Sequence, residues 1–134
     1  MRKTIFATVL CLVAIMVAAG IATAAKPSSS LNLVVLGSDG NAAPVQPTYG
    51  STITFDVQTN QTDHPNVNVR CYQGSAFIFD GWASFWPGAM TGENFVLSSN
   101  YWTGGSANCT ARLVAFDSKG REQTLTSMTF QVGA

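Results

Sequence analysis

The nucleophilic and ionisable side chains of this 134-residue chain do not form a familiar catalytic pattern. His64, the one histidine of the sequence, stands between Asp63 and Pro65, and there is no Gly-x-Ser-x-Gly elbow or glycine-rich phosphate loop. Nucleophilic catalysis needs a base beside a serine, cysteine or threonine. We therefore expect His64 to be a solvated loop residue and the protein not to be an enzyme.

A pair of carboxylates is the other route to hydrolysis. Asp80 and Glu93 flank an aromatic segment and could in principle act as acid and base on a glycoside. Nothing in the sequence determines their separation, and turn or surface residues are the ordinary interpretation. A hydrolase built on this pair stays open as a third hypothesis, which requires the two carboxyl groups to lie within about 10 Å of each other.

Metal ions and cofactors lack a suitable set of ligands in this sequence. A zinc site needs more ligands than a single histidine can supply, and two of the three cysteines, Cys71 and Cys109, are better used as a disulfide. The stretch Ser38-Asp39-Gly40-Asn41 offers one carboxylate where a calcium loop needs several oxygen ligands. We expect neither a metal nor a cofactor.

Four aromatic side chains are the best candidates for a binding surface. They adjoin glycine, proline, asparagine or serine near the expected ends of strands, and they are Trp82, Trp86, Tyr101 and Trp102. Exposed rings at such positions can stack on sugar faces or anchor a protein interface. A small domain also needs bulky groups in its core, and for Trp82 the core is the favoured position.

The first 24 residues have the layout of a secretory signal peptide. Arg2 and Lys3 precede an apolar stretch over residues 5–21, and Ala22-Thr23-Ala24 matches a small-x-small cleavage site. We expect a signal-peptide helix over 1–24, a short polar tail over 25–30 and one domain over 31–134, secreted to the extracellular space or the exterior of the cell envelope. An uncleaved anchor is the alternative, because the apolar stretch approaches the about 20 residues of a membrane span.

The charge balance after cleavage excludes some classes of partner. Five basic against seven acidic residues remain, a net charge of −2, so attraction to phosphate or anionic lipid is unsupported. We expect no nucleic-acid partner and, once the leader is removed, no membrane. The mature part also has 37 uncharged polar residues against 12 charged ones, which is typical of a secreted β domain.

The mature chain is expected to form short strands with no helix. Between residues 51 and 57, for example, Ile53, Phe55 and Val57 alternate with polar side chains, so one face is buried and the other is wet. Strands are predicted over residues 31–36, 51–57, 67–72, 76–86, 95–97, 109–116 and 123–132. Seven short strands separated by turns describe an antiparallel β-sandwich of about 100 residues, with a closed barrel as the rival.

The cysteines agree with both export and the sandwich. Loss of Cys11 with the leader leaves an even pair, Cys71 and Cys109, which an oxidising compartment allows to form a disulfide. If the strands follow the immunoglobulin order, Cys71 ends the third strand and Cys109 begins the sixth. These strands are antiparallel neighbours, so a short bond at the rim of the sheet is geometrically reasonable.

A resemblance to a known family rests on two parts of the chain. The stretch from Pro47 to Val57, together with residues 109–116 and their hairpin return to Val132, resembles the immunoglobulin-like domains of secreted bacterial proteins. The chain departs from antibody-type domains because the strand over 51–57 has no cysteine and Ala107 stands where the tyrosine corner would be. The resemblance implies a non-catalytic binding or display module, and it implies no ligand.

The expected function is therefore a secreted immunoglobulin-like module that binds a protein or surface partner through loops or an exposed sheet face. The alternative is a small carbohydrate-binding module that uses exposed aromatic rings to bind a glycan. Burial of both Trp86 and Trp102 would remove the sugar hypothesis.

Overall fold

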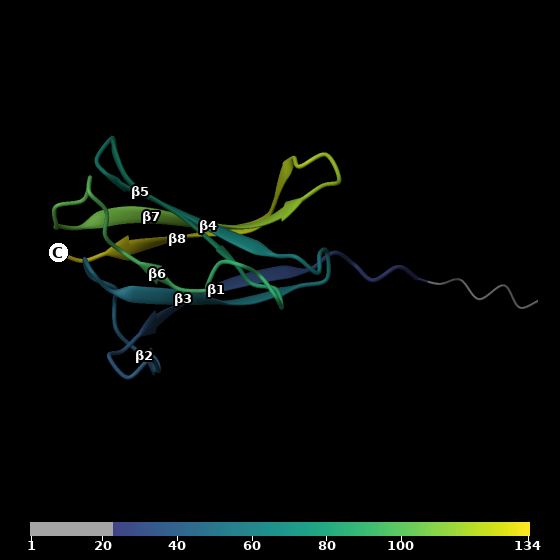
Figure 1. Ribbon diagram of the computed structural model, residues 1–134, viewed down its shortest axis with the longest axis horizontal. Coiled ribbons are helices and arrows are strands. Elements are labelled where there is room, and N and C mark those ends of the chain that lie inside the picture. The colour runs from purple at the N-terminus through teal and green to yellow at the C-terminus, as the bar shows by residue number, and fades with distance from the viewer. Residues whose placement is uncertain (1–22) are drawn as a thin grey trace, which may run out of the picture.

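The computed structural model describes residues 23–134, which form strands and no helix. Two antiparallel four-stranded sheets stack face to face, one in the order β2-β1-β3-β6 and the other in the order β5-β4-β7-β8 (Figure 1). The strands are β1 (Ser29–Leu36), β2 (Ala42–Ala43), β3 (Thr52–Thr59), β4 (Asn66–Gln73), β5 (Ala76–Ser84), β6 (Phe95–Val96), β7 (Ala107–Phe116) and β8 (Glu122–Val132). The predicted antiparallel β-sandwich is confirmed, and its strand order is compatible with an immunoglobulin-like arrangement.

Across residues 23–134 the chain has no helix long and apolar enough to cross a bilayer. The signal-peptide helix expected over 1–24 falls, apart from its last two positions, outside the residues that the structure describes.

Most predicted strand ends shift by one or two residues, and three differences matter more for the fold. β1 begins at Ser29, because Ser29 and Ser30 pair with β3 opposite Thr59 and Gln58, so the end of the expected polar tail is strand. The connection after β1 contains a two-residue strand, β2, that returns antiparallel to β1. The aromatic strand β5 ends at Ser84 and lies at the edge of its sheet beside β4.

The core lies between the sheets and is made of the apolar residues that alternate along the strands. Ile53 and Phe55 of β3 face it as predicted, and Phe55 meets Phe95 and Phe130 edge to face. The largest fully buried apolar side chains are Trp102, Ile53, Leu97, Leu113, Val67, Val69, Val114 and Val132. Burial of these side chains is the main favourable term in the stability of the sandwich.

A disulfide joins the two central strands of the second sheet, as predicted. Cys71 of β4 and Cys109 of β7 stand directly opposite each other with Cα atoms 4.1 Å apart, and both side chains are buried. The bond closes a loop with a sequence separation of 38 residues. On the chain-entropy model such a closure stabilises the fold by roughly 4 kcal/mol, a large share of the stability of a small domain.

Candidate functional site

The outer face of the β5-β4-β7-β8 sheet carries the side chains that alternate with the core residues. Strand register arranges them in rows across the sheet. We call this surface the outer face; it carries the side chains of Asn68, Arg70, Tyr72, Phe77, Asp80, Trp82, Arg112, Phe116 and Glu122. Parity along β4 places Asn68, Arg70 and Tyr72 here, because their neighbours Val67, Val69 and Cys71 point into the core.

Two pairs of aromatic rings lie at opposite ends of the outer face. Tyr72 and Phe77 have ring centroids 5.4 Å apart with a tilt of 44°, and Trp82 and Phe116 have centroids 6.0 Å apart with a tilt of 36°. All four side chains are exposed, Trp82 to 39%. The core position favoured for Trp82 from sequence is therefore wrong. Its strand register puts it opposite Asn68, on the side away from the core.

Beside Trp82, Asn68 is fully buried although it points outward. Its Nδ2 donates to Asp80 Oδ1 at 2.6 Å and to the carbonyl of Gly81 at 3.1 Å, and its Oδ1 accepts from Arg112 Nη2 at 2.8 Å. Both amide hydrogens and the amide oxygen are therefore used. A buried polar group with all its partners in place stabilises one arrangement of its neighbours.

Ion pairs extend this hydrogen-bonded group across the whole sheet. Arg112 reaches Glu122 of β8, with Nη1 3.3 Å from Oε2, and Asp80 of β5 lies 3.5 Å from Nε of Arg70. The charged side chains of four strands are thus held in order at the centre of the outer face, at partly exposed positions where each single pair contributes little to stability.

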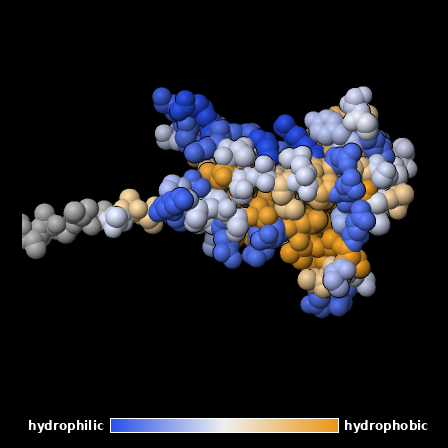
Figure 2. Space-filling model, turned by 180° about the vertical axis from the view of Figure 1, so that it is seen from behind, coloured by the Kyte–Doolittle hydropathy of each residue, from blue (hydrophilic) through white to orange (hydrophobic). Residues whose placement is uncertain are grey.

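The shape of the outer face is concave along the strands. The turn between β4 and β5 and the tip of the β7–β8 hairpin both project away from the other sheet (Figure 1). Figure 2 shows the surface hollowed between these two projections. The two aromatic pairs and the charged centre therefore belong to one recessed surface.

Tyr101 is the most exposed of the four candidate aromatics. It lies in the turn between β6 and β7 and is 82% exposed. Together with Phe77, Phe79 and Ser99 it lines a pocket of about 600 Å³ at the edge of β5. Tyr101 therefore adjoins the end of the outer face that carries Tyr72 and Phe77.

Trp102 and Trp86 occupy different environments. Trp102 is 1% exposed, its Nε1 donates to the carbonyl of Gly105 at 3.1 Å, and its ring packs edge-on against Tyr49 and Phe79. It is a core residue and offers no surface to a ligand. Trp86 is half-buried, with its ring 5.0 Å from that of His64, and its buried Nε1 has no hydrogen-bond partner among residues 23–134.

The two carboxylates considered for hydrolysis lie in different elements, Asp80 in β5 and Glu93 in the loop before β6. Asp80 belongs to the hydrogen-bonded group of the outer face, whereas Glu93 precedes β6 and its backbone carbonyl accepts a hydrogen bond from Thr54 Oγ1 of β3. The structure thus gives them separate hydrogen-bonded neighbourhoods. Within the described part of the chain, no cluster of three or more histidine, cysteine or carboxylate side chains could hold a metal ion.

Sequence reasoning missed Phe116, Tyr72 and the Asn68–Arg112 pair as parts of a surface. The available signal was the parity of β4 and β7, because residues one step from Cys71 and Cys109 must face away from the core. No protein-family model, curated protein or solved structure matches the chain. The interpretation of the outer face therefore depends on its own chemistry.

Proposed function

We propose that the protein is a secreted, non-catalytic immunoglobulin-like module that binds a protein or surface partner through the outer face. The observation that carries the proposal is the placement of two exposed aromatic pairs around a centre of ordered arginine, asparagine and carboxylate groups. Aromatic and arginine side chains are enriched where protein interfaces have their strongest contacts. Tyrosine and tryptophan rings also lose little conformational entropy when they are covered.

Order in the free protein supports the same proposal. Hydrogen bonds already hold Asn68, Asp80 and Arg112 in place in the free protein. Binding of a partner therefore loses little conformational entropy at these side chains. The recessed shape between the two projections favours a convex partner surface over a flat one. Secretion is proposed from the leader pattern, and the disulfide between Cys71 and Cys109 is compatible with it.

Carbohydrate binding is the alternative, and it now depends on Trp82 and Tyr101. Both rings are exposed, and Trp82 lies beside the amide of Asn68. The ring pairs on the outer face are tilted by 36° and 44°, whereas a flat row of rings is the arrangement expected of a sugar-binding surface. We therefore place protein binding first.

The test compares capture by the purified protein and by a double variant, W82A together with F116A. Proteins from the extracellular and envelope fractions of the source cells serve as prey, and a glycan array is probed in parallel. Val96→Ala is the control, because Val96 is an exposed apolar side chain in the opposite sheet. Circular dichroism and thermal unfolding establish that all variants fold.

The expected result is a protein captured by the wild type and by Val96→Ala, with at least a tenfold weaker affinity for the double variant. Specific glycan signals that the double variant loses would move the function to carbohydrate binding. Equal capture by the wild type, Val96→Ala and the double variant would show that the outer face is not the binding surface.

A further inference from the structure

The outer edge of β8 is a sheet edge that the rest of the described chain leaves largely uncovered. β8 pairs with β7 on one side. On the other side, the segment around Thr48 lies parallel to the residue after the strand, Gly133, which donates to the carbonyl of Pro47 at 2.8 Å and accepts from the backbone N–H of Tyr49 at 3.2 Å. Residues 23–134 supply no other segment that pairs with this edge.

The disulfide identifies which backbone groups point outward. Antiparallel partners with Cα atoms about 4.5 Å apart are non-hydrogen-bonded pairs, and Cys71 and Cys109 are 4.1 Å apart, so the backbone groups of Cys109 point toward β8. Its partner there is Phe130, whose N–H and C=O point back toward β7. Because the direction alternates along a strand, the backbone N–H and C=O groups that point away from β7 are those of Ser127, Thr129 and Gln131. The same alternation predicts that Gly133 points away from β7, and its hydrogen bonds to Pro47 and Tyr49 agree with this.

Both ends of this free edge are delimited. At one end the chain around Pro47 occupies the place next to Gly133. At the other end the β7–β8 register shifts between Leu113 and Val114, and the hairpin beyond this bulge bends away from the sandwich (Figure 1). The accessible part of the edge is therefore residues 126–131, which we call the β8 window.

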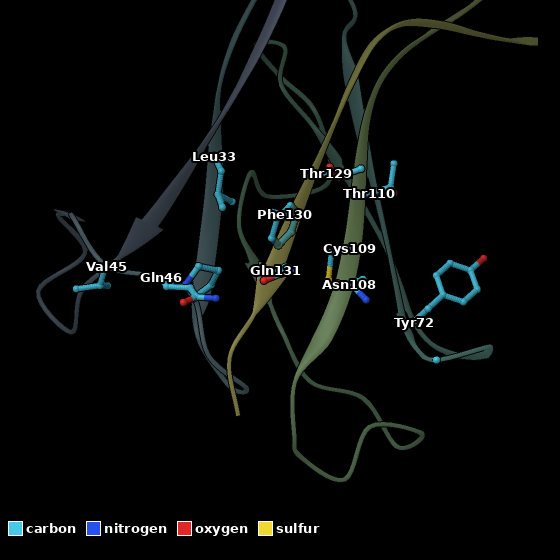
Figure 3. Close-up of a pocket in the computed structure, with 12 residues that line it drawn as sticks. Leu33, Val45, Gln46, Tyr72, Asn108, Cys109, Thr110, Thr129, Phe130 and Gln131 are labelled. Atoms are coloured by element: carbon cyan, nitrogen blue, oxygen red, sulfur yellow. The ribbon is translucent and has the colours of Figure 1, made fainter.

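A groove runs beside the β8 window. It has a volume of about 830 Å³, and Figure 3 shows its lining running from Leu33 and Val45 on one side, past Phe130 and Gln131 of β8, to Asn108 of β7 on the other. None of the residues that line it is charged. Figure 2 shows a mainly apolar surface on this side of the molecule, next to the β2 projection. The groove would accept an extended, uncharged segment with apolar side chains on one face.

The geometry points to a second copy of this chain as the occupant, with the β8 window of each copy pairing antiparallel across a two-fold axis. The segment from Gln123 to Gln131 has no charged residue, and over residues 127–131 hydroxyl or amide side chains alternate with Met128 and Phe130. It therefore has the chemistry that the groove accepts, and no like charges oppose each other. Exposed edges are commonly protected by lysine or proline, and the window has neither.

The register between the two β8 strands follows from the backbone groups that point away from β7. With Thr129 on the two-fold axis, it faces Thr129 of the second copy, and Ser127 faces Gln131 of the second copy. All three residues then form hydrogen-bonded pairs, with about six backbone hydrogen bonds in total. Met128 and Phe130 of each copy are covered on the core side. The two outer faces then point in the same direction, so the dimer would bind a repetitive partner bivalently.

The first test measures the oligomeric state by sedimentation velocity over a wide concentration range. Thr129→Pro removes an outward N–H, which an edge strand tolerates, and adds a ring that blocks the second strand. Thr129→Lys places like charges opposite each other without changing the backbone. Thr129→Val keeps the N–H and is the matched control.

The wild type and Thr129→Val are expected to dimerise, and the proline and lysine variants to be at least tenfold weaker in dimerisation with unchanged circular dichroism. A wild type that stays monomeric at high micromolar concentration would overturn the proposal, even if it binds a synthetic peptide of residues 123–131. Dimerisation that survives both variants would place the interface elsewhere and overturn it as well.

A cross-linking test examines the register. Thr129→Cys brings two new thiols to opposite positions at about 5.5 Å between Cα atoms, within reach of a disulfide. Ser127→Cys lies opposite Gln131 instead, so its two thiols are too far apart to bond. Under mild oxidation the first variant should form a covalent dimer and the second should not. The reverse result, or equal cross-linking of both, contradicts the proposed pairing.

Discussion

Arg112 donates a 2.8 Å hydrogen bond from Nη2 to Oδ1 of Asn68, and this bond joins β7 to β4 on the outer face of the sheet. Asn68 is fully buried there, opposite Trp82 on one side and Arg112 on the other. A buried amide is thus part of a surface that a partner would cover. Its hydrogen bonds affect both the stability of the sheet and the order of the proposed binding face.

Replacement of Asn68 by leucine should lower the free energy of unfolding by about 2 kcal/mol. The reason is that Asp80 and Arg112 lose a buried partner that their remaining neighbours do not replace. Denaturant unfolding, with the midpoint and slope compared with the wild type, measures the change.

Arg70→Met is the matched control for this prediction. Arg70 belongs to the same sheet but makes only one exposed ion pair, with Nε 3.5 Å from Asp80 Oδ1, so its loss should cost less than about 0.5 kcal/mol. If the free energy of unfolding falls equally in both variants, the hydrogen bonds of the buried Asn68 amide do not contribute more than an exposed ion pair.

Gly81 makes close packing between β5 and the core possible. A Cβ at this position would lie 2.8 Å from Cδ1 of Phe95 and 2.9 Å from the ring of Phe79. Gly81→Ala should therefore destabilise the fold by roughly 1–3 kcal/mol through overpacking. Gly92→Ala, where a Cβ has no neighbour within 4 Å, should stay within about 0.5 kcal/mol of the wild type. Equal thermal shifts for the two variants would contradict this explanation.

The strands and the disulfide could be predicted from sequence because the strict alternation of apolar and polar residues specifies which side chains face the core. Ile53 and Phe55 alternate with polar neighbours, and both are buried. Cys71 and Cys109 share the parity of apolar neighbours in two strands that the immunoglobulin order makes adjacent, and they form the bond. Where period and topology agree, one sequence is enough to place a side chain on a face.

The faces of the aromatic strand could not be predicted, because a bulge breaks its alternation. The β4–β5 register shifts beside Tyr72, so Ile78 is an extra residue on β5. As a result Phe77 is exposed while Phe79, also an odd-numbered position, packs against the core. Trp82 beyond the bulge faces outward for the same reason.

Trp102 shows a second limit of sequence reasoning. It lies in a loop, where a period of two has no meaning, and its neighbouring turn residues leave a core position and an exposed position about equally open. Tyr49 and Phe79, which are distant in the chain, bury it instead. Contacts of this kind are tertiary, and local spacing does not report them.

The buried disulfide should be inaccessible to reagents in the native protein. Alkylation without reductant should label neither Cys71 nor Cys109, because both are paired and at most 2% exposed. The variant C71A together with C109A should lose roughly 4 kcal/mol of stability on the chain-entropy model. Mass spectrometry and denaturant unfolding measure the two effects, and labelling of either thiol in the folded protein would contradict the bond.

The turn between β7 and β8 should respond to acid through Asp117. Hydrogen bonds from the backbone N–H and the guanidinium of Arg121, and from the backbone N–H of Lys119, hold the pKa of the Asp117 carboxyl below its ordinary value of 3.8. Because the folded pKa is the lower one, its stabilisation is present above about pH 4 and is lost as the pH falls through the folded pKa. An NMR titration of the Asp117 carboxyl should give a midpoint below 3.8.

Amide exchange tests whether this carboxylate orders the turn. The backbone amides of Lys119 and Arg121 should lose protection in acid in step with the titration of Asp117, because each donates to its Oδ1 at 2.8 Å and 2.9 Å. Asp117→Asn keeps an acceptor oxygen but no titratable charge, so its turn should show no such loss over the same range. A midpoint at or above 3.8, or protection that changes equally in Asp117→Asn, would mean that the charge of Asp117 does not hold the hairpin tip.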